Sequence, residues 1–320
     1  MTAQPALADA SVSFAAVDRA SIKAAEAHIP GLAADRVKID PLPGGLTNRN
    51  YRLTWGDGRR AVARCSSGKS SLLAIDRVAE MANAKVAAGL SVGPRVIGFA
   101  PDQGVTLVEW IDGRTFSDDD LDDPVQLTRV AAACRRLHGG PRFVNDFDMF
   151  AIQAGYLTTV LDRGFRLPSR YLDFMPQAEQ IRAALAVRDE GTVACHNDLL
   201  AANIMDDGER IWFIDYEYSG NNDACFELGN IWSEANLEPS RLAHLVAAYY
   251  GRPAPAKVAR ARLLALMSKY GWTLWASIQD GVSDVDFDFW SWGMEKYERA
   301  VAEFDGPEFS QLIEAVQQPN

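Results

Sequence analysis

The chain has 320 residues, of which 48% are hydrophobic and 23% charged, a composition typical of a globular protein long enough to bury a sizeable core. Its formal net charge of −11 argues against a nucleic-acid partner, because phosphate backbones are bound by clusters of Lys and Arg. The same acidity is compatible with a cationic substrate or with metal ions, although simple solubility explains it as well.

The cysteines and the apolar runs indicate a reducing, cytoplasmic location. The four cysteines stand singly along the chain without a C-x-x-C pair, so neither a disulfide framework nor a zinc site is expected. The N-terminal residues lack the basic stretch and apolar run of a signal peptide. No stretch reaches the roughly 18 uninterrupted apolar residues of a membrane helix, so we expect no membrane insertion.

Residues 1–112 predict a small lobe built around antiparallel strands. An N-terminal helix is expected to end near Pro30, and strand-like stretches joined by tight turns follow between 37 and 65. The pattern becomes helical over 75–89, and two further strands are expected between 92 and 113. The expected apolar face of this helix consists of Ile75, Val78, Ala79, Ala82 and Val86.

Residues 113–320 predict a larger, mostly helical lobe. The acidic stretch from Asp112 to Pro124 is a candidate hinge between the two lobes. His138, near the end of the first helix after this stretch, is more typical of a capping or packing residue than of a catalyst. Together the two parts predict an α+β fold in which a small antiparallel-sheet lobe precedes the helical lobe.

The stretch 193–222 combines short apolar runs with a polar motif. The turn D-D-G-E between two apolar runs predicts a β-hairpin, which brings Asn203 at its start near Asp215 at its end. Asp198 lies in the loop that leads into this hairpin, and its spacing to Asn203 matches the D-x-x-x-x-N pattern of kinase catalytic loops. Asp and Asn are also common turn residues, but turn formation alone does not explain this spacing.

Two features of the small lobe fit a role at phosphates. Arg64 is expected on a strand, where a phosphate-binding Lys stands in kinases, and Glu80 on the following helix could pair with it, although Arg64 could also be an ordinary surface residue. A loop between two strands has the backbone freedom and the donors to cover a nucleotide, although hairpins use the same residues structurally. This loop contains Gly44, Gly45, Thr47 and Asn48.

The segments "HNDLLAANI" and "IDYEYSGNNDACFELGNIWSE" resemble the two signature motifs of the choline/ethanolamine kinases, within the aminoglycoside-phosphotransferase and protein-kinase-like superfamily. The resemblance covers roughly residues 40–300. It implies a bilobal protein-kinase-like fold and an enzyme that uses ATP and Mg²⁺. It implies Asp198 as the catalytic base and Asn203 and Asp215 as magnesium ligands. The positions that it implies at the nucleotide are Gly44, Gly45, Thr47, Asn48, Arg64 with its partner Glu80, and the backbone of Glu109, Trp110 and Ile111. Asn197 distinguishes the chain from aminoglycoside and related small-molecule kinases, which usually have Gly at this position. Glu227 is a departure, because the family more often has Asp there.

The aromatic residues near the C-terminus suggest a binding site for a cation. A quaternary ammonium cannot donate hydrogen bonds, so it is held by aromatic faces and nearby carboxylates. Trp272 and Trp275 are three apart on one expected helix and can face the same way, although aromatic residues at this spacing are just as typical of a core. The further candidates for the substrate site are Trp290, Tyr297, Glu234 and Glu217.

These features predict an ATP- and Mg²⁺-dependent kinase that phosphorylates the hydroxyl of choline or ethanolamine, a small-molecule amino alcohol. One alternative keeps the fold but changes the acceptor to an aminoglycoside, thiamine or another amino alcohol. A second alternative is a nucleotide-binding regulatory module without turnover, although such a module has no need of a base at Asp198. The sequence leaves open the choice between choline and ethanolamine and the oligomeric state.

Overall fold

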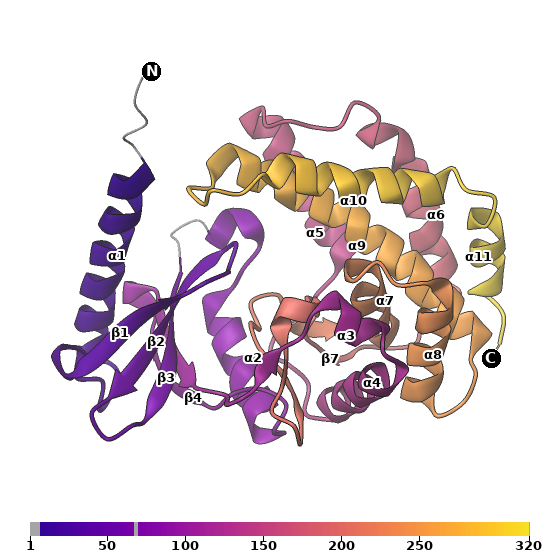
Figure 1. Ribbon diagram of the computed structural model, residues 1–320. Helices are drawn as coiled ribbons and strands as arrows, with labels where there is room; N and C mark the ends of the chain where they lie inside the picture. Colours follow the sequence, from indigo (N-terminus) through magenta and orange to yellow (C-terminus); the bar gives the residue numbers. More distant parts are fainter. Residues whose placement is uncertain (1–6, 67–69, 320) are drawn as a thin grey trace. The chain divides into compact units, whose positions relative to one another are not determined.

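The computed structural model describes residues 7–66 and 70–319 and divides the chain into two compact units (Figure 1). Unit 1 comprises residues 1–70 and 94–111, and unit 2 comprises residues 71–93 and 112–320. Unit 1 has 11 Lys and Arg against 8 Asp and Glu, whereas unit 2 has 21 against 35, so their formal charges are +3 and −14. The acidity of the chain therefore resides entirely in unit 2.

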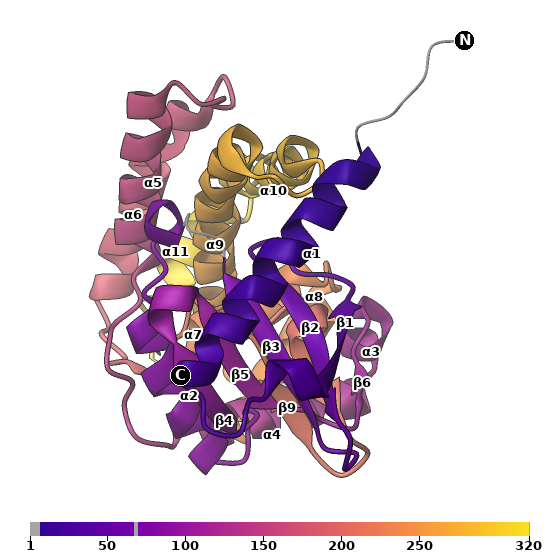
Figure 2. The same ribbon diagram turned by 90° about the vertical axis from the view of Figure 1, so that its left-hand side faces the viewer.

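Unit 1 is a five-stranded antiparallel sheet with the order β1-β2-β3-β5-β4, as the sequence predicted. A helix, α1 (Leu7–Ala24), crosses one face of this sheet (Figure 2). Asp18 on α1 accepts hydrogen bonds from Arg49 and from the Tyr51 hydroxyl on β2, which attaches the helix to the sheet. The strands are β1 (Val37–Leu42), β2 (Asn48–Trp55), β3 (Arg60–Ser66), β4 (Val96–Ala100) and β5 (Val105–Glu109).

The alternation of side chains along β3 separates the core of unit 1 from its polar face. Ala61, Ala63 and Cys65 are buried, and they pack with apolar residues that follow α1, such as Ile29. Arg64 points to the opposite face because successive strand residues alternate.

Unit 2 contains two small antiparallel sheets. One has the order β6-β8-β9, with β6 (Arg114–Thr115), β8 (Ile204–Asp206) and β9 (Ile211–Phe213). The other pairs β7 (Val193–Cys195) with β10 (Gly220–Asn222). The pairing of β8 with β9 confirms the predicted hairpin, and the segment suggested as a hinge forms β6 and α3 (Asp118–Asp122) within unit 2.

The helices of unit 2 surround one long central helix, α9 (Pro255–Val282). This helix is buried along most of its length against α5, α7 and α10 (Figure 1). Small residues allow the closest approaches: a side chain at Gly229 would collide with the backbone oxygen of Ala261. The other helices are α2 (Arg77–Gly89), α4 (Pro124–His138), α5 (Met149–Arg163), α6 (Met175–Ala186), α7 (Ala224–Glu234), α8 (Pro239–Tyr250), α10 (Phe289–Phe304) and α11 (Phe309–Ala315).

The buried face of α2 differs from the predicted apolar face. Val78 is 67% exposed, whereas the polar residues Glu80 and Asn83 are buried. The inward face is polar because its groups are paired: Glu80 accepts from Arg77, and the Asn83 amide donates to Ser219 and Asn145. The apolar period therefore predicted the helix and part of its inward face, since Ala79 is buried, but it misplaced Val78 and did not include the buried polar residues.

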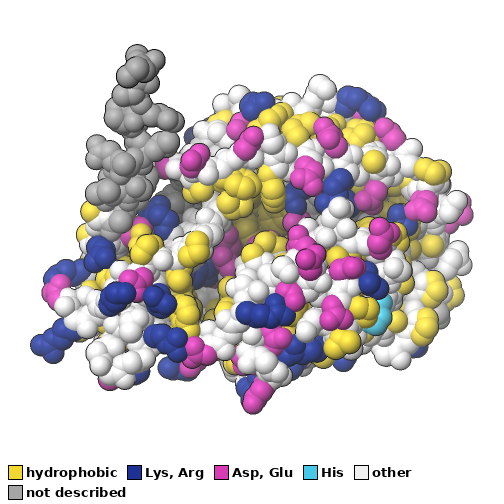
Figure 3. Space-filling view, viewed as in Figure 1, with side chains coloured by type: hydrophobic (Ala, Val, Ile, Leu, Met, Phe, Trp, Pro, Cys, Tyr) yellow, Lys and Arg dark blue, Asp and Glu magenta, His cyan; other side chains and the backbone are white. Residues whose placement is uncertain are grey.

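The surface of the molecule is rich in charge. On the face shown in Figure 3, Lys and Arg side chains gather over unit 1, and Asp and Glu side chains are more frequent over unit 2. None of the helices formed by the described residues combines the length and apolarity that crossing a bilayer requires.

Candidate active site

The three polar residues of the predicted motif come together at one end of the β8–β9 hairpin. The Asn203 side chain donates to the backbone oxygen of Asp198 over 2.8 Å and to its carboxylate over 3.2 Å. The backbone N–H of Ile214 donates to the Asn203 backbone oxygen, so Asp215 directly follows a residue bonded to Asn203. Asp215 has a φ of 69°, a left-handed conformation that turns the chain sharply after β9.

A fully buried carboxylate, Glu227 of α7, holds the loop that carries Asp198. Its two oxygens accept the backbone N–H groups of His196 and Asn197 over 3.0 and 2.7 Å. Burial opposes ionisation of Glu227, but hydrogen bonding and attraction by His138, together with the backbone donors, hold its pKa below the usual value. A buried anion thus fixes the two residues before Asp198 to the start of a helix.

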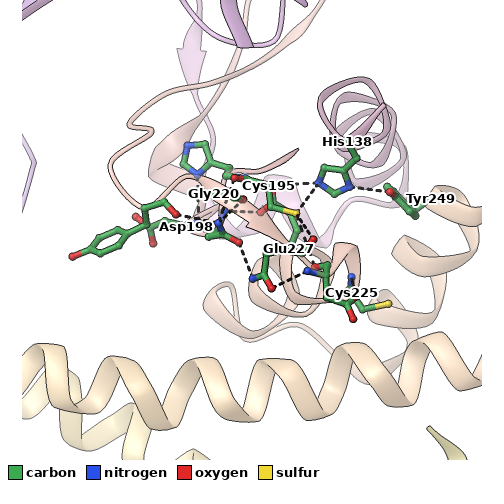
Figure 4. A network of polar contacts seen from close by, with 12 residues as sticks. His138, Cys195, Asp198, Gly220, Cys225, Glu227 and Tyr249 are labelled. Carbon is green, nitrogen blue, oxygen red and sulfur yellow. Dashed lines mark hydrogen bonds and ion pairs between the residues drawn. The ribbon is translucent and has the colours of Figure 1, made fainter. Parts of the chain in front are cut away.

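Behind Glu227 the network continues through His138 to Tyr249 (Figure 4). The Nδ1 atom of His138 lies 2.8 Å from the Tyr249 hydroxyl, and its Nε2 atom lies 3.7 Å from Glu227 and 3.6 Å from the Cys195 sulfur. The possible metal-ligating atoms of His138, Cys195 and Glu227 all lie within 4.8 Å of one another, as the ligands of a metal ion would. Because both oxygens of Glu227 already accept backbone N–H groups, we interpret the cluster as a support for the loop, in line with the packing role expected of His138.

The environment of Asp198 is strongly acidic. Desolvation is the main cause that raises its pKa well above the usual value, and the carboxylates of Glu234, Asp215 and Glu217 add to it. Lys296 acts in the opposite direction. The negative charge gathered here attracts positively charged ligands.

Glu217 and Glu80 share one cation, Arg77 of α2. The Arg77 Nη1 atom lies 2.7 Å from a Glu80 oxygen and 3.0 Å from a Glu217 oxygen, and both carboxylates are 4% exposed. Sequence reasoning did not select Arg77, and the expected pairing of Glu80 with Arg64 stays a prediction. Arg64 belongs to unit 1, whereas Glu80, Glu217 and Arg77 all belong to unit 2.

Four aromatic side chains form a connected group near Asp198. The rings of Tyr218 and Trp272 meet edge to face with centroids 4.8 Å apart. The Trp275 indole N–H donates to the Tyr218 hydroxyl over 2.8 Å, and the Trp275 ring packs against Trp292 at 5.5 Å. Burial raises the pKa of the Tyr218 hydroxyl well above its usual value, and the negative charge of Asp198 adds to this shift, so the two side chains lie within electrostatic reach of each other. We call these four residues the aromatic group.

Two of the predicted aromatic candidates lie elsewhere. Trp290 stacks under Arg166, whose guanidinium carbon is 3.8 Å from the ring centre, and Tyr297 packs on Tyr171 inside the helical core. The structure instead adds Tyr218 and Trp292, which sequence reasoning did not select. Tyr218 could have been found because it stands three residues after Asp215 in the same motif.

Glu234, at the end of α7, adjoins the aromatic group through Lys296. The Lys296 ammonium donates to one Glu234 oxygen over 2.6 Å and lies 4.2 Å from the centre of the Trp292 ring. The other oxygen, Oε1, is buried and has no hydrogen-bond partner among the described residues. A buried carboxylate oxygen of this kind can still accept a donor or attract a cation.

Unit 1 carries the residues predicted at the nucleotide. Gly44 and Gly45 have φ values of 88° and 90°, and a side chain at Gly45 would collide with the Asn48 backbone oxygen, so this tight turn requires glycine. The Trp110 ring lies between the Arg52 and Arg60 guanidinium groups, at 5.8 and 5.5 Å. The remaining candidates are Thr47 in the same connection, Asn48 at the start of β2, Arg64 on β3, Glu109 at the end of β5 and Ile111 just after it.

Comparisons with known proteins agree with this geometry. The phosphotransferase enzyme family (APH) matches residues 38–263. The crystal structure of a choline/ethanolamine kinase family protein from Mesorhizobium loti is 33% identical with a TM-score of 0.80, and the match covers 94% of this chain and 98% of that one. The chain belongs to the phosphotransferase enzyme family. Within it, the similarity to the Mesorhizobium protein places the chain in the choline/ethanolamine kinase family.

Curated relatives of this phosphotransferase carry matching names. "Probable choline kinase 2" of Arabidopsis thaliana is 25% identical, and the match covers 82% of this chain and 84% of that protein. "Ethanolamine kinase 2" of Mus musculus is 27% identical over 81% of this chain and 74% of that protein. The predicted family and the protein-kinase-like fold are confirmed, and the chain is a small-molecule kinase that transfers a phosphoryl group to an alcohol.

Proposed function

We propose that this phosphotransferase transfers the γ-phosphoryl group of ATP, with Mg²⁺, to the hydroxyl of choline or ethanolamine. The observation that carries the proposal is that Asp198, bonded to Asn203, lies within electrostatic reach of both Tyr218 of the aromatic group and the Glu234 carboxylate. A kinase for an amino alcohol needs a base for the hydroxyl and a separate site for the cation at the other end of the substrate. Unit 2 offers both.

Asp198 is the proposed base. Its carboxylate orients the acceptor hydroxyl and takes its proton as the oxygen attacks the γ-phosphorus. The bond between that phosphorus and the bridging oxygen of ADP then breaks, and ADP leaves. The acidic surroundings that raise the pKa of Asp198 match this task, since they increase its affinity for a proton.

Asn203 and Asp215 would hold Mg²⁺. Asn203 uses its amide nitrogen toward Asp198, so its amide oxygen is the atom that a metal would take, and Asp215 supplies a carboxylate. Hard oxygen ligands of this kind suit Mg²⁺, which neutralises charge on the transferring phosphates when bound. Glu217 is paired with Arg77, so its proposed role is to help hold the segment that follows Asp215 in place rather than to bind Mg²⁺ itself.

The nucleotide is assigned to residues of unit 1. We assign the phosphates to Arg64 and to the turn of Gly44, Gly45, Thr47 and Asn48, and the adenine to the backbone from Glu109 to Ile111. The net positive charge of unit 1 supports this assignment, because ATP is an anion.

The ammonium end of the acceptor is assigned to the aromatic group and to Glu234. Aromatic faces attract a quaternary ammonium by about 0.5–2 kcal/mol each, and the buried Oε1 of Glu234 supplies negative charge. The net charge of −14 on unit 2 supports a cationic acceptor over a neutral one.

An ADP-release assay with a panel of acceptors tests the proposal. Choline, ethanolamine, thiamine and an aminoglycoside are compared for the wild type and for Asp198→Asn, which keeps the size of the side chain. We expect turnover with choline or ethanolamine only, and a loss of at least about 1,000-fold in kcat for Asp198→Asn. Turnover with thiamine or an aminoglycoside instead would favour a kinase for that acceptor. Turnover with no acceptor would favour a nucleotide-binding regulatory module.

A further inference from the structure

Asn197, the residue before Asp198, is held in a conformation that disfavours its side chain. It is completely buried and has a φ of 67°. This left-handed region is open to glycine without cost, whereas other residues occupy it at a penalty that is smallest for Asn and Asp. The turn alone would be satisfied by glycine, so the presence of a buried amide side chain at position 197 needs a separate explanation.

The side chain of Asn197 connects two segments that are far apart in the sequence. Its Nδ2 atom donates to the backbone oxygens of Tyr218 and Gly220 over 3.0 and 3.2 Å, and its Oδ1 atom accepts from the Asn222 amide over 2.9 Å. A longer contact of 3.4 Å reaches the oxygen of Cys195. Figure 4 shows Gly220, one of these acceptors, and Asp198, which follows Asn197 in the chain, within the same network.

The two segments carry different parts of the reaction. The loop of Asn197 presents Asp198, and the backbone segment that accepts its amide presents the Tyr218 ring to Trp272 and Trp275. Glu227 fixes the backbone of the same loop from the other side. The side-chain amide of Asn197 thus connects the loop that carries Asp198 directly to the backbone of Tyr218, a member of the aromatic group.

We propose that Asn197 is a positioning residue that sets the Asp198 carboxylate relative to the acceptor-binding Tyr218. This inference rests on the proposed function, because it takes Asp198 as the base. A displacement of about 1 Å in a catalytic group can cost on the order of 100-fold in rate, so two or three hydrogen bonds across this link are enough to matter.

Asn197→Gly and Asn197→Asp separate the bonds from the backbone conformation. Glycine adopts the same φ without strain but removes every side-chain bond. Aspartate keeps the size and the tolerance for this conformation, but its carboxylate cannot donate to the oxygens of Tyr218 and Gly220. We expect both variants to lower kcat by about 10- to 100-fold and to raise the acceptor KM, with the ATP KM unchanged.

Asn221→Ala is the matched control. Asn221 is also buried, and its side chain makes a comparable set of bonds, but these go to Phe143, Asn145 and Asp146 rather than to the loop of Asp198. It should lower the melting temperature and leave kcat and both KM values near wild type. Kinetics are measured at a temperature where melting curves show all variants folded.

Asn222→Ala provides a milder test if Asn197→Gly fails to fold. It removes one of the bonds to Asn197, the donor to Oδ1, together with the acceptor of the Asp223 N–H, and should lower kcat by about 2- to 5-fold, less than the direct variants. The inference is overturned if Asn197→Gly, or Asn222→Ala in its place, behaves like Asn221→Ala while Asp198→Asn is inactive. If Asp198→Asn is active, the base assignment of the proposed function fails as well.

Discussion

The indole N–H of Trp275 donates a hydrogen bond to the hydroxyl of Tyr218 over 2.8 Å. The two residues come from distant parts of the chain, α9 and the segment after β9, and their contact joins the central helix to the segment that follows Asp215. The bond orients both rings within the aromatic group, so it should influence how the group binds a cation.

Replacing Trp275 should weaken acceptor binding more than nucleotide binding. Trp275→Phe removes the indole N–H and leaves a smaller ring, so we expect the acceptor KM to rise about 3- to 10-fold with little change in the ATP KM. Steady-state kinetics with each substrate varied in turn measure both constants. Trp290→Phe is the control, because Trp290 packs on Arg166 and should leave both constants unchanged. Equal effects of the two variants would remove Trp275 from the acceptor site.

The pair of Glu234 and Lys296 allows stability to be separated from recognition. Both side chains are less than 10% exposed, so Glu234→Gln or Lys296→Met alone should cost about 3 kcal/mol by leaving one buried charge unpaired. The double variant should recover most of this stability in denaturant unfolding. Its acceptor KM should nevertheless stay raised, because the Glu234 charge is missing. A double variant with wild-type acceptor KM would show that Glu234 does not act on the cation.

The contact between α7 and α9 should be intolerant of a single methyl group. A Cβ atom at Gly229 would lie 2.1 Å from the Ala261 backbone oxygen, so Gly229→Ala should destabilise the protein by about 2–3 kcal/mol through a forced shift of one helix. Gly155 on α5 has open space around it, and Gly155→Ala should stabilise by about 0.5–1 kcal/mol. Denaturant unfolding of both variants measures the contrast, and similar results for the two would contradict the packing described for Gly229.

The sequence was sufficient for elements whose pattern is local. The β8–β9 hairpin was predicted because a D-D-G-E turn separates two short apolar runs, and the neighbourhood of Asp198 and Asn203 followed from it. The antiparallel pairs β1–β2, β2–β3 and β4–β5 of unit 1 were predicted for the same reason, since each joins strands adjacent in the chain. The pair β3–β5 differs, because α2 and β4 lie between these two strands in the sequence.

Features that depend on how helices face one another were not predictable in this way. The sequence analysis selected Trp290 rather than Trp292, but Trp290 lies against Arg166, whereas Trp292 packs against Trp275. The polar inner face of α2 was missed because Asn83 pairs with Ser219, which lies far away in the sequence. Long-range partners of buried polar groups leave no apolar period to detect.

The helix α7 begins near Glu227, which holds the loop of Asp198, and ends at Glu234, which neighbours the aromatic group. These two residues are seven positions apart, a span of about 10 Å of rigid helix. Two of the three tryptophans of the aromatic group stand on α9 and the third on α10, whereas the support of the Asp198 loop comes from α7. A change of side chains on α9 or α10 therefore leaves that support in place.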